Sequence, residues 1–141
     1  GLGDSANGVM MHTSWHEGVP FVGSLAGKDF TNKDFMAAYK AKYGRDADED
    51  SAIPFAVCQG IEQAIIGAGS TDQKAMKAWL KARTKAEPVR TVLGPFAWDK
   101  VGLPLERPFL MAQWQAGKLN FVYPTDEFEG VSPLIYPKPQ W

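Results

Sequence analysis

The sequence predicts a mixed α/β fold, and three observations lead to this prediction. Between residues 31 and 84, apolar side chains recur three and four positions apart, as they do on one face of a helix. From Pro88 onward the period changes to short β-prone runs separated by glycine and proline. A short apolar run at residues 8–14 precedes the helical region and predicts a buried strand.

The first helix is predicted between Thr31 and Gly44. Thr31 can cap its start, Asp34 follows three residues later as a variant of the capping box, and Gly44 supplies a stop. The apolar face of this helix comprises Phe35, Met36, Tyr39 and Tyr43. The stretch before it, residues 17–28, is rich in glycine and proline and predicts a loop.

The second helix is predicted over residues 51–68 and is the most apolar of the three. Pro54 fits only the first turn of a helix, which places the start close to Asp50 or Ser51. Because little polar surface remains along it, we expect this helix to be mostly buried and Cys58 to be an inert core thiol. Its apolar residues are Phe55, Val57, Cys58, Ile61, Ala64, Ile65 and Ala68.

The third helix is predicted from a capping pattern at residues 70–73 to about Thr84. The spacing of its apolar residues predicts one buried face, from which the guanidinium group of Arg83 reaches water. That face comprises Met76, Trp79, Leu80 and Arg83.

Strands are predicted in the last third of the chain. Residues 89–93 and 96–98 are β-prone and are interrupted by Gly94-Pro95. Residues 109–115 and 119–123 predict a hairpin, because a short loop containing glycine joins them. The proline-rich tail from residue 124 predicts an extended strap, with a short strand around residues 134–136.

Strands and helices do not alternate along the chain often enough to build a parallel sheet of their own. Two interpretations remain. One is a small α+β domain. The other is a set of elements that complete sheets whose remaining strands lie in a missing segment. The N-terminus has neither a secretory signal nor an initiator methionine, so we expect a processed, truncated or internal piece of a longer chain.

Composition is that of an ordinary globular domain and argues against several classes of partner. The 141 residues are 45% hydrophobic and 22% charged, and the net charge is −1. That charge balance gives no electrostatic reason to expect nucleic acid or an anionic membrane as a partner. The single cysteine excludes an internal disulfide and a cysteine-based zinc site.

The chain carries no recognised catalytic motif. It has no Gly-x-Ser-x-Gly elbow, no phosphate loop and no dinucleotide fingerprint. His12 and His16 have the spacing of zinc ligands on a helix, but they follow a predicted strand, and Gly18 and Pro20 break any helix there. We therefore predict no metal, no cofactor and no enzyme activity.

Four segments, in the same order, carry a resemblance to a known family. They are the Phe-x-x-x-Tyr-x-x-x-Tyr-Gly helix at 35–44, the stretch at 64–72 ending in Ala-Gly-Ser-Thr-Asp, the hairpin at 91–102, and the strand pair at 112–118 ending in Gly-Lys. Together they resemble the C-terminal part of a type I periplasmic solute-binding protein. The similarity is to the Leu/Ile/Val-binding family of ABC transporters.

The resemblance implies a periplasmic-binding-protein type I fold, in which two Rossmann-like lobes close around a cleft and the chain crosses the hinge three times. By this resemblance, residues 1–23 form part of the C-terminal lobe and residues 24–105 form part of the N-terminal lobe. Residues 106–141 form the hinge return and the end of the C-terminal lobe. The chain would complete neither lobe, so we expect it to fold beside a missing N-terminal segment of the same protein, or as a swapped oligomer.

The resemblance also implies a function. The protein would capture a small amino-acid-like or organic-acid ligand in the periplasm, or at the outer face of the membrane, and deliver it to the membrane permease of an ABC importer. An alternative is a ligand-sensing regulatory or receptor domain with the same fold. A third hypothesis, a small metal-dependent enzyme, would depend on His16.

Four residues are the candidate ligand contacts. By the resemblance, Asp50 stands where branched-chain binders have a pocket aromatic, which argues against a purely aliphatic ligand. Asp50 and Ser51 at the helix entry are expected to make polar contacts, the other interpretation of Asp50 being a plain N-cap. His12 and Trp15 lie at the end of the first strand, where the family crosses the hinge, and Trp15 either stacks on the ligand or packs between lobes.

Overall fold

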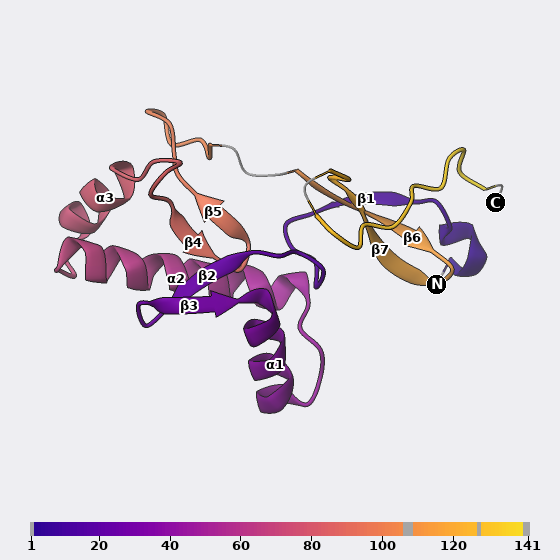
Figure 1. Cartoon of the computed structure of the whole chain (residues 1–141), viewed down its shortest axis with the longest axis horizontal. Helices are drawn as coiled ribbons and strands as arrows, with labels where there is room; N and C mark the ends of the chain where they lie inside the picture. Colours follow the sequence, from indigo (N-terminus) through magenta and orange to yellow (C-terminus); the bar gives the residue numbers. More distant parts are fainter. Residues whose placement is uncertain (1, 106–108, 127, 140–141) are drawn as a thin grey trace. The chain divides into compact units, whose positions relative to one another are not determined.

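The computed structural model describes residues 2–105, 109–126 and 128–139 and divides into two compact units (Figure 1). Unit 1 comprises Gly1–Val19 and Pro108–Trp141, and unit 2 comprises Pro20–Arg107. The chain thus begins in unit 1, builds all of unit 2 and returns to unit 1. None of the helices in the described ranges is both long and apolar enough to cross a membrane.

Unit 1 is built on a three-stranded antiparallel sheet of order β1-β6-β7. The strands are β1 (Met10–Thr13), β6 (Leu110–Gln115) and β7 (Lys118–Tyr123), and a short 3-10 turn, η1 (Gly3–Ala6), precedes them. The predicted hairpin is confirmed, and its two-residue turn places Ala116 and Gly117 at φ +49° and +77°, as a type I′ turn requires. The prediction of a buried first strand is wrong: β1 has β6 as its one neighbour in this sheet, and three of its four residues are exposed.

The C-terminal strap of unit 1 is held by side-chain amides. The predicted strand around residues 134–136 does not form. Instead, the Ile135 N–H donates to Gln113 Oε1 (2.9 Å), and Gln113 Nε2 donates back to the Ile135 carbonyl (3.1 Å). Gln115 Nε2 donates to the Pro133 carbonyl (2.8 Å). Prolines lack the N–H groups that a strand ladder needs, so side chains take the place of the missing neighbour.

Replacing Gln113 by leucine should release this strap. The Ile135 N–H then loses its acceptor, and we expect its hydrogen exchange to accelerate by roughly tenfold or more. Exchange followed by NMR at Ile135 measures the effect. Gln115→Leu is the matched control, because Gln115 binds the strap through a carbonyl only. Equal acceleration in both variants would contradict this role of Gln113.

Unit 2 opens with a β-hairpin that sequence analysis misses. Strands β2 (Val22–Leu25) and β3 (Lys28–Thr31) pair antiparallel where a loop is predicted over residues 17–28. Their turn residues, Ala26 and Gly27, have φ values of +50° and +73°. The Ala26 N–H donates to the Glu62 carboxylate at 3.1 Å, which ties the turn to the second helix.

Three helices follow in unit 2: α1 (Asn32–Tyr43), α2 (Glu49–Ala68) and α3 (Gln73–Lys81). The first is confirmed together with its Thr31–Asp34 capping box and its left-handed end at Gly44. The second begins earlier than predicted because Asp48 caps it, which puts Pro54 in its second turn. The third is capped by Asp72 and ends before Thr84.

A second hairpin, β4 (Val89–Thr91) and β5 (Gly94–Phe96), lies against α2. The predicted interruption at Gly94-Pro95 is wrong, since both residues belong to β5 and the chain turns at Val92 and Leu93. Pro95 is tolerated because β5 has a strand neighbour on one side, β4, within the described sheet.

Two glutamines of helix α2 form hydrogen bonds to the backbone of both hairpins of unit 2. The buried Gln59 donates to the Ser24 carbonyl (3.0 Å) and accepts from the Val92 N–H (2.9 Å). Gln63 donates to the Arg90 carbonyl (2.8 Å) and accepts from the Arg90 N–H (3.0 Å). The Gln63 amide therefore acts as a strand neighbour for β4, whereas the Gln59 amide joins β2 to the turn between β4 and β5.

The prediction that α2 is mostly buried is wrong for this chain. Its small residues Ala52, Ala56 and Ala64 are buried together with Gln59, whereas several larger apolar side chains are exposed. Those exposed are Ile53, Val57, Ile61 and Ile66. Cys58 is exposed too, so the expectation of a core thiol is wrong. The described elements of unit 2 cover one side of this helix and leave the other open.

Candidate ligand-binding groove

An open groove of about 820 Å³ lies between α1 and the N-terminus of α2. Aromatic rings form its apolar wall, and the rings of Phe35 and Phe55 pack at a tilt with their centroids 4.8 Å apart. Polar side chains from the α1–α2 connection and the first turn of α2 form the other wall. Its lining comprises Phe30, Phe35, Ala38, Tyr39, Lys42, Tyr43, Arg45, Asp48, Asp50, Ser51, Pro54, Phe55 and Cys58.

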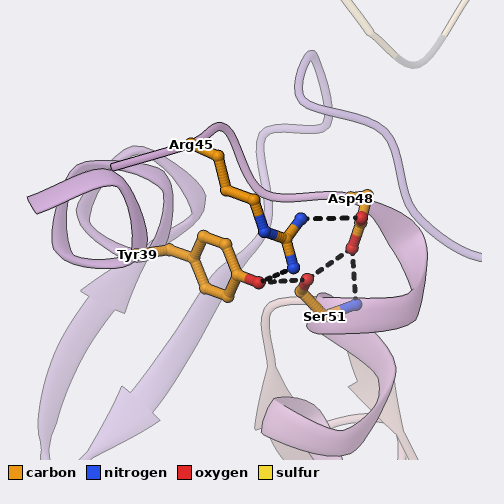
Figure 2. A network of polar contacts seen from close by, with 4 residues as sticks. All are labelled: Tyr39, Arg45, Asp48 and Ser51. Carbon is orange, nitrogen blue, oxygen red and sulfur yellow. Dashed lines mark hydrogen bonds and ion pairs between the residues drawn. The ribbon is translucent and has the colours of Figure 1, made fainter. Parts of the chain in front are cut away.

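A polar network of four residues organises this groove, as Figure 2 shows. Arg45 Nη1 lies 3.1 Å from Asp48 Oδ2, and Arg45 Nη2 donates to the Tyr39 hydroxyl. The Arg45 guanidinium also lies over the Tyr39 ring, 5.1 Å from its centroid. Asp48 accepts from the Ser51 N–H at 2.9 Å, which is the N-cap bond of α2.

The hydroxyl groups of the network can be assigned from what each atom can donate. Ser51 Oγ contacts both the Asp48 carboxylate and, at 2.9 Å, the Tyr39 hydroxyl. A serine has one O–H, and an ionised carboxylate can only accept, so Ser51 donates to Asp48. Tyr39 accepts from Arg45 and therefore donates its own proton to Ser51 Oγ. These bonds fix the network and leave Ser51 with little capacity for a ligand.

The network lowers the pKa of Asp48 below its ordinary value of 3.8. The first cause is the hydrogen bond from the Ser51 side chain, and the Ser51 N–H and the Arg45 charge act in the same direction. Each of these groups favours the ionised carboxylate. Asp48 therefore stays ionised and capped onto α2 as the pH falls toward 3.8.

This shift predicts a pH dependence that Asp48→Asn should weaken. A carboxyl whose folded pKa is depressed contributes stability above its unfolded value, here 3.8, and that contribution is lost as the pH falls through the folded value. Asparagine caps helices as well as aspartate does, but it does not titrate. On acidification from above to below pH 3.8, we expect the urea midpoint to fall more for the wild-type chain than for Asp48→Asn. Equal losses would contradict the assignment.

Asp50 is the acidic side chain that the network leaves available. It is exposed and lines the groove, and within the described residues no hydrogen bond of its side chain is found. Because Asp48 is the N-cap, the interpretation of Asp50 as a plain N-cap is wrong; Asp50 is the second residue of α2. Pro54 has no N–H to donate to the Asp50 carbonyl four residues earlier. Asp50 thus offers both carboxylate and carbonyl acceptors near the groove.

The other two predicted contacts belong to unit 1. His12 is exposed on β1, and its ring lies 4.8 Å from that of Phe109. Trp15 is 5% exposed, and its backbone carbonyl accepts from the Thr13 hydroxyl at 2.6 Å. The structure therefore places Asp50 and Ser51 together in the unit 2 groove, while His12 and Trp15 stay predicted ligand contacts of the other unit.

His16 has neighbours that do not resemble a metal site. Its ring stacks on Phe121 at 5.5 Å, Nδ1 accepts from the Gly18 N–H, and Nε2 lies 3.4 Å from the Leu119 carbonyl. Throughout the described ranges, no group of three or more His, Cys, Asp or Glu side chains is arranged to hold a metal ion.

Sequence analysis did not single out Tyr39, Arg45 or Asp48 as members of this site. The spacing of apolar residues places Tyr39 on an apolar helix face, and residues 45–50 are polar and acidic in the sequence. The available signal was Asp48 three residues before Ser51, which is the spacing of a side-chain N-cap.

Comparison with known proteins finds curated relatives and similar solved structures. No family model matches the chain. The Leu/Ile/Val-binding protein homolog 1 of Brucella abortus strain 2308 is 29% identical over 97 residues, and its namesake in biovar 1 strain 9-941 gives the same values. This alignment covers 67% of the chain and 25% of each relative, so the chain spans a small part of their length.

The crystal structure of the leucine-binding protein LivK of Thermotoga maritima MSB8 superposes with a TM-score of 0.59 at 21% identity. The superposition covers 82% of this chain and 30% of that one. The chain has part of the type I periplasmic-binding-protein fold. The fold class expected from the sequence motifs is thereby confirmed. A partial periplasmic-binding-protein fold also accounts for three small antiparallel sheets with no shared central sheet among the described residues.

Proposed function

We propose that this chain is the C-terminal part of an extracytoplasmic solute-binding protein that serves an ABC importer. The observation that carries the proposal is its similarity to Leu/Ile/Val-binding proteins over two thirds of its length. In this proposal the protein is not an enzyme: it encloses a small amino-acid-like or organic-acid ligand between two lobes in the periplasm. A membrane permease would receive the ligand from it.

The lobe assignment proposed from the sequence is residues 1–23 and 106–141 for the C-terminal lobe and 24–105 for the N-terminal lobe. It is supported by the boundaries of the two compact units, which lie after Val19 and before Pro108. The rest of each lobe would come from an N-terminal segment of the same protein. Such a segment would also supply the remaining ligand contacts.

The groove favours a ligand with a hydrogen-bond donor or a positive charge at one end. Asp50 supplies an ionised acceptor, and the wall with Phe30, Phe35 and Phe55 supplies apolar contact area. An α-amino acid has an ammonium group that fits the first feature and a side chain that fits the second. The presence of Asp50 therefore favours an amino acid or an amide as the ligand over a purely hydrocarbon solute.

A thermal-shift screen of amino acids, amides and small organic acids tests the proposal on the complete polypeptide. We expect at least one solute to raise the melting temperature, since a ligand that binds only the folded state stabilises it. Asp50→Asn should lower the affinity for that solute by about tenfold, because the variant loses one charge-assisted hydrogen bond to it. Asp46→Asn is the matched control, as Asp46 pairs with Lys40 outside the groove lining. No stabilising solute would contradict the proposal.

A further inference from the structure

A second groove in unit 2 is almost entirely apolar. It encloses about 270 Å³ between α2, α3 and the β4–β5 hairpin. Thr91 is the one hydroxyl-bearing residue of its lining, and that hydroxyl donates to the Gly94 carbonyl and accepts from the Leu93 N–H, both at 3.0 Å. The lining comprises Ile53, Ala56, Val57, Gly60, Ile61, Ala64, Met76, Leu80, Val89, Thr91, Leu93, Phe96 and Trp98.

One wall of this apolar groove is a stripe of large aliphatic side chains on α2. Ile53, Val57 and Ile61 follow one another at intervals of four residues and therefore share a face of the helix. Val57 is 57% exposed and Ile61 is 48% exposed. The surface thus has the composition of a protein core with one layer missing.

The lengths of the related proteins indicate which layer that is. The chain covers 30% of the LivK structure whose fold it shares and 25% of each Brucella relative. Most of the polypeptide that completes this fold therefore lies outside these 141 residues in the related proteins. A charged ligand or an acidic surface is a poor occupant, because the lining offers it no partner of opposite charge.

We propose that the apolar groove of α2, α3 and the β4–β5 hairpin docks a segment of the same polypeptide that lies outside residues 1–141. Val57 and Ile61 are then core residues of a lobe in the complete protein. The docked segment presents apolar side chains to this groove and needs no charged contact there. The inference rests on the proposed function for placing the segment in the same polypeptide.

Thiol labelling of the complete polypeptide tests this assignment. Cys58, the sole cysteine of the 141 residues, is replaced by serine, and Val57→Cys and Ile61→Cys are introduced one at a time. Val101→Cys is the control, since Val101 is 72% exposed in the turn after Asp99 and outside this lining. Alkylation by iodoacetamide is compared between the native protein and the same protein unfolded in urea, with no solute added.

We expect both groove cysteines to react at least roughly tenfold more slowly in the native protein than in urea, and the control to change by about twofold or less. Three results would overturn the proposal: equal native rates for groove and control cysteines, protection in the complete polypeptide that grows with its concentration, or a complete gene that adds no residues. The first two outcomes are independent of solute binding, so they are separate from a failed thermal-shift screen.

Discussion

Gln59→Leu should lower the free energy of unfolding by roughly 2–5 kcal/mol, a large fraction of the stability of a small domain. Gln59 is 1% exposed and is the hydrogen-bond partner of the Ser24 carbonyl and the Val92 N–H. Leucine has a similar volume but satisfies neither group. Two buried backbone groups then lose their partners, and each costs about 1–3 kcal/mol.

The measurement is urea unfolding of the chain followed by far-UV circular dichroism. Gln73→Leu is the matched control, because Gln73 is exposed at the start of α3 and should change stability by about 0.5 kcal/mol or less. A loss for Gln59→Leu no larger than for Gln73→Leu would show that α2 is not pinned in this way. Gly23 belongs to the same arrangement, since a Cβ there would lie 2.6 Å from Gln59 Nε2.

Gly67→Ala and Gly60→Ala should have opposite effects although both glycines lie in α2. A Cβ at residue 67 would lie 2.1 Å from Trp79 Nε1 and Cε2, so the indole ring must move. Such overpacking costs about 1–3 kcal/mol and outweighs the helical gain of up to about 1 kcal/mol from alanine. At residue 60 the nearest atom, Val89 Cγ1, lies at 3.8 Å, which is ordinary contact.

We therefore expect Gly67→Ala to be destabilised by about 1–2 kcal/mol and Gly60→Ala to be stabilised by about 0.5–1 kcal/mol. Thermal and urea unfolding of the two variants measure both effects in the same helix. Stabilisation of both variants would mean that helix propensity alone decides the outcome. In that case Trp79 would not pack against Gly67 as described.

The local signals in the sequence predict the elements whose ends are set by their own residues. The first helix is an example, because Thr31, Asp34 and Gly44 form its caps without help from other segments. The hairpin through Ala116 and Gly117 is another, since the turn itself selects the pairing. In both cases the deciding interactions join residues that are near in sequence.

Features that depend on distant partners were predicted less well. The β2–β3 hairpin was missed because Ala26-Gly27 lies in a stretch whose glycines and prolines favour a loop. The start of α2 was misplaced because the proline rule outweighed three successive acidic residues, of which Asp48 forms the cap. The exposure of Val57 depends on which segments pack against α2, and no local pattern contains that information.

The discontinuity of unit 1 has a consequence for synthesis on the ribosome. In its sheet, His12 pairs with Met111, so β1 emerges long before the strand that must accept its hydrogen bonds. All of the residues of unit 2 are translated in this interval, and domains generally fold as they emerge. The nascent β1 therefore waits, unpaired, until β6 leaves the exit tunnel. Its short length of four residues limits the danger of mispairing during that wait.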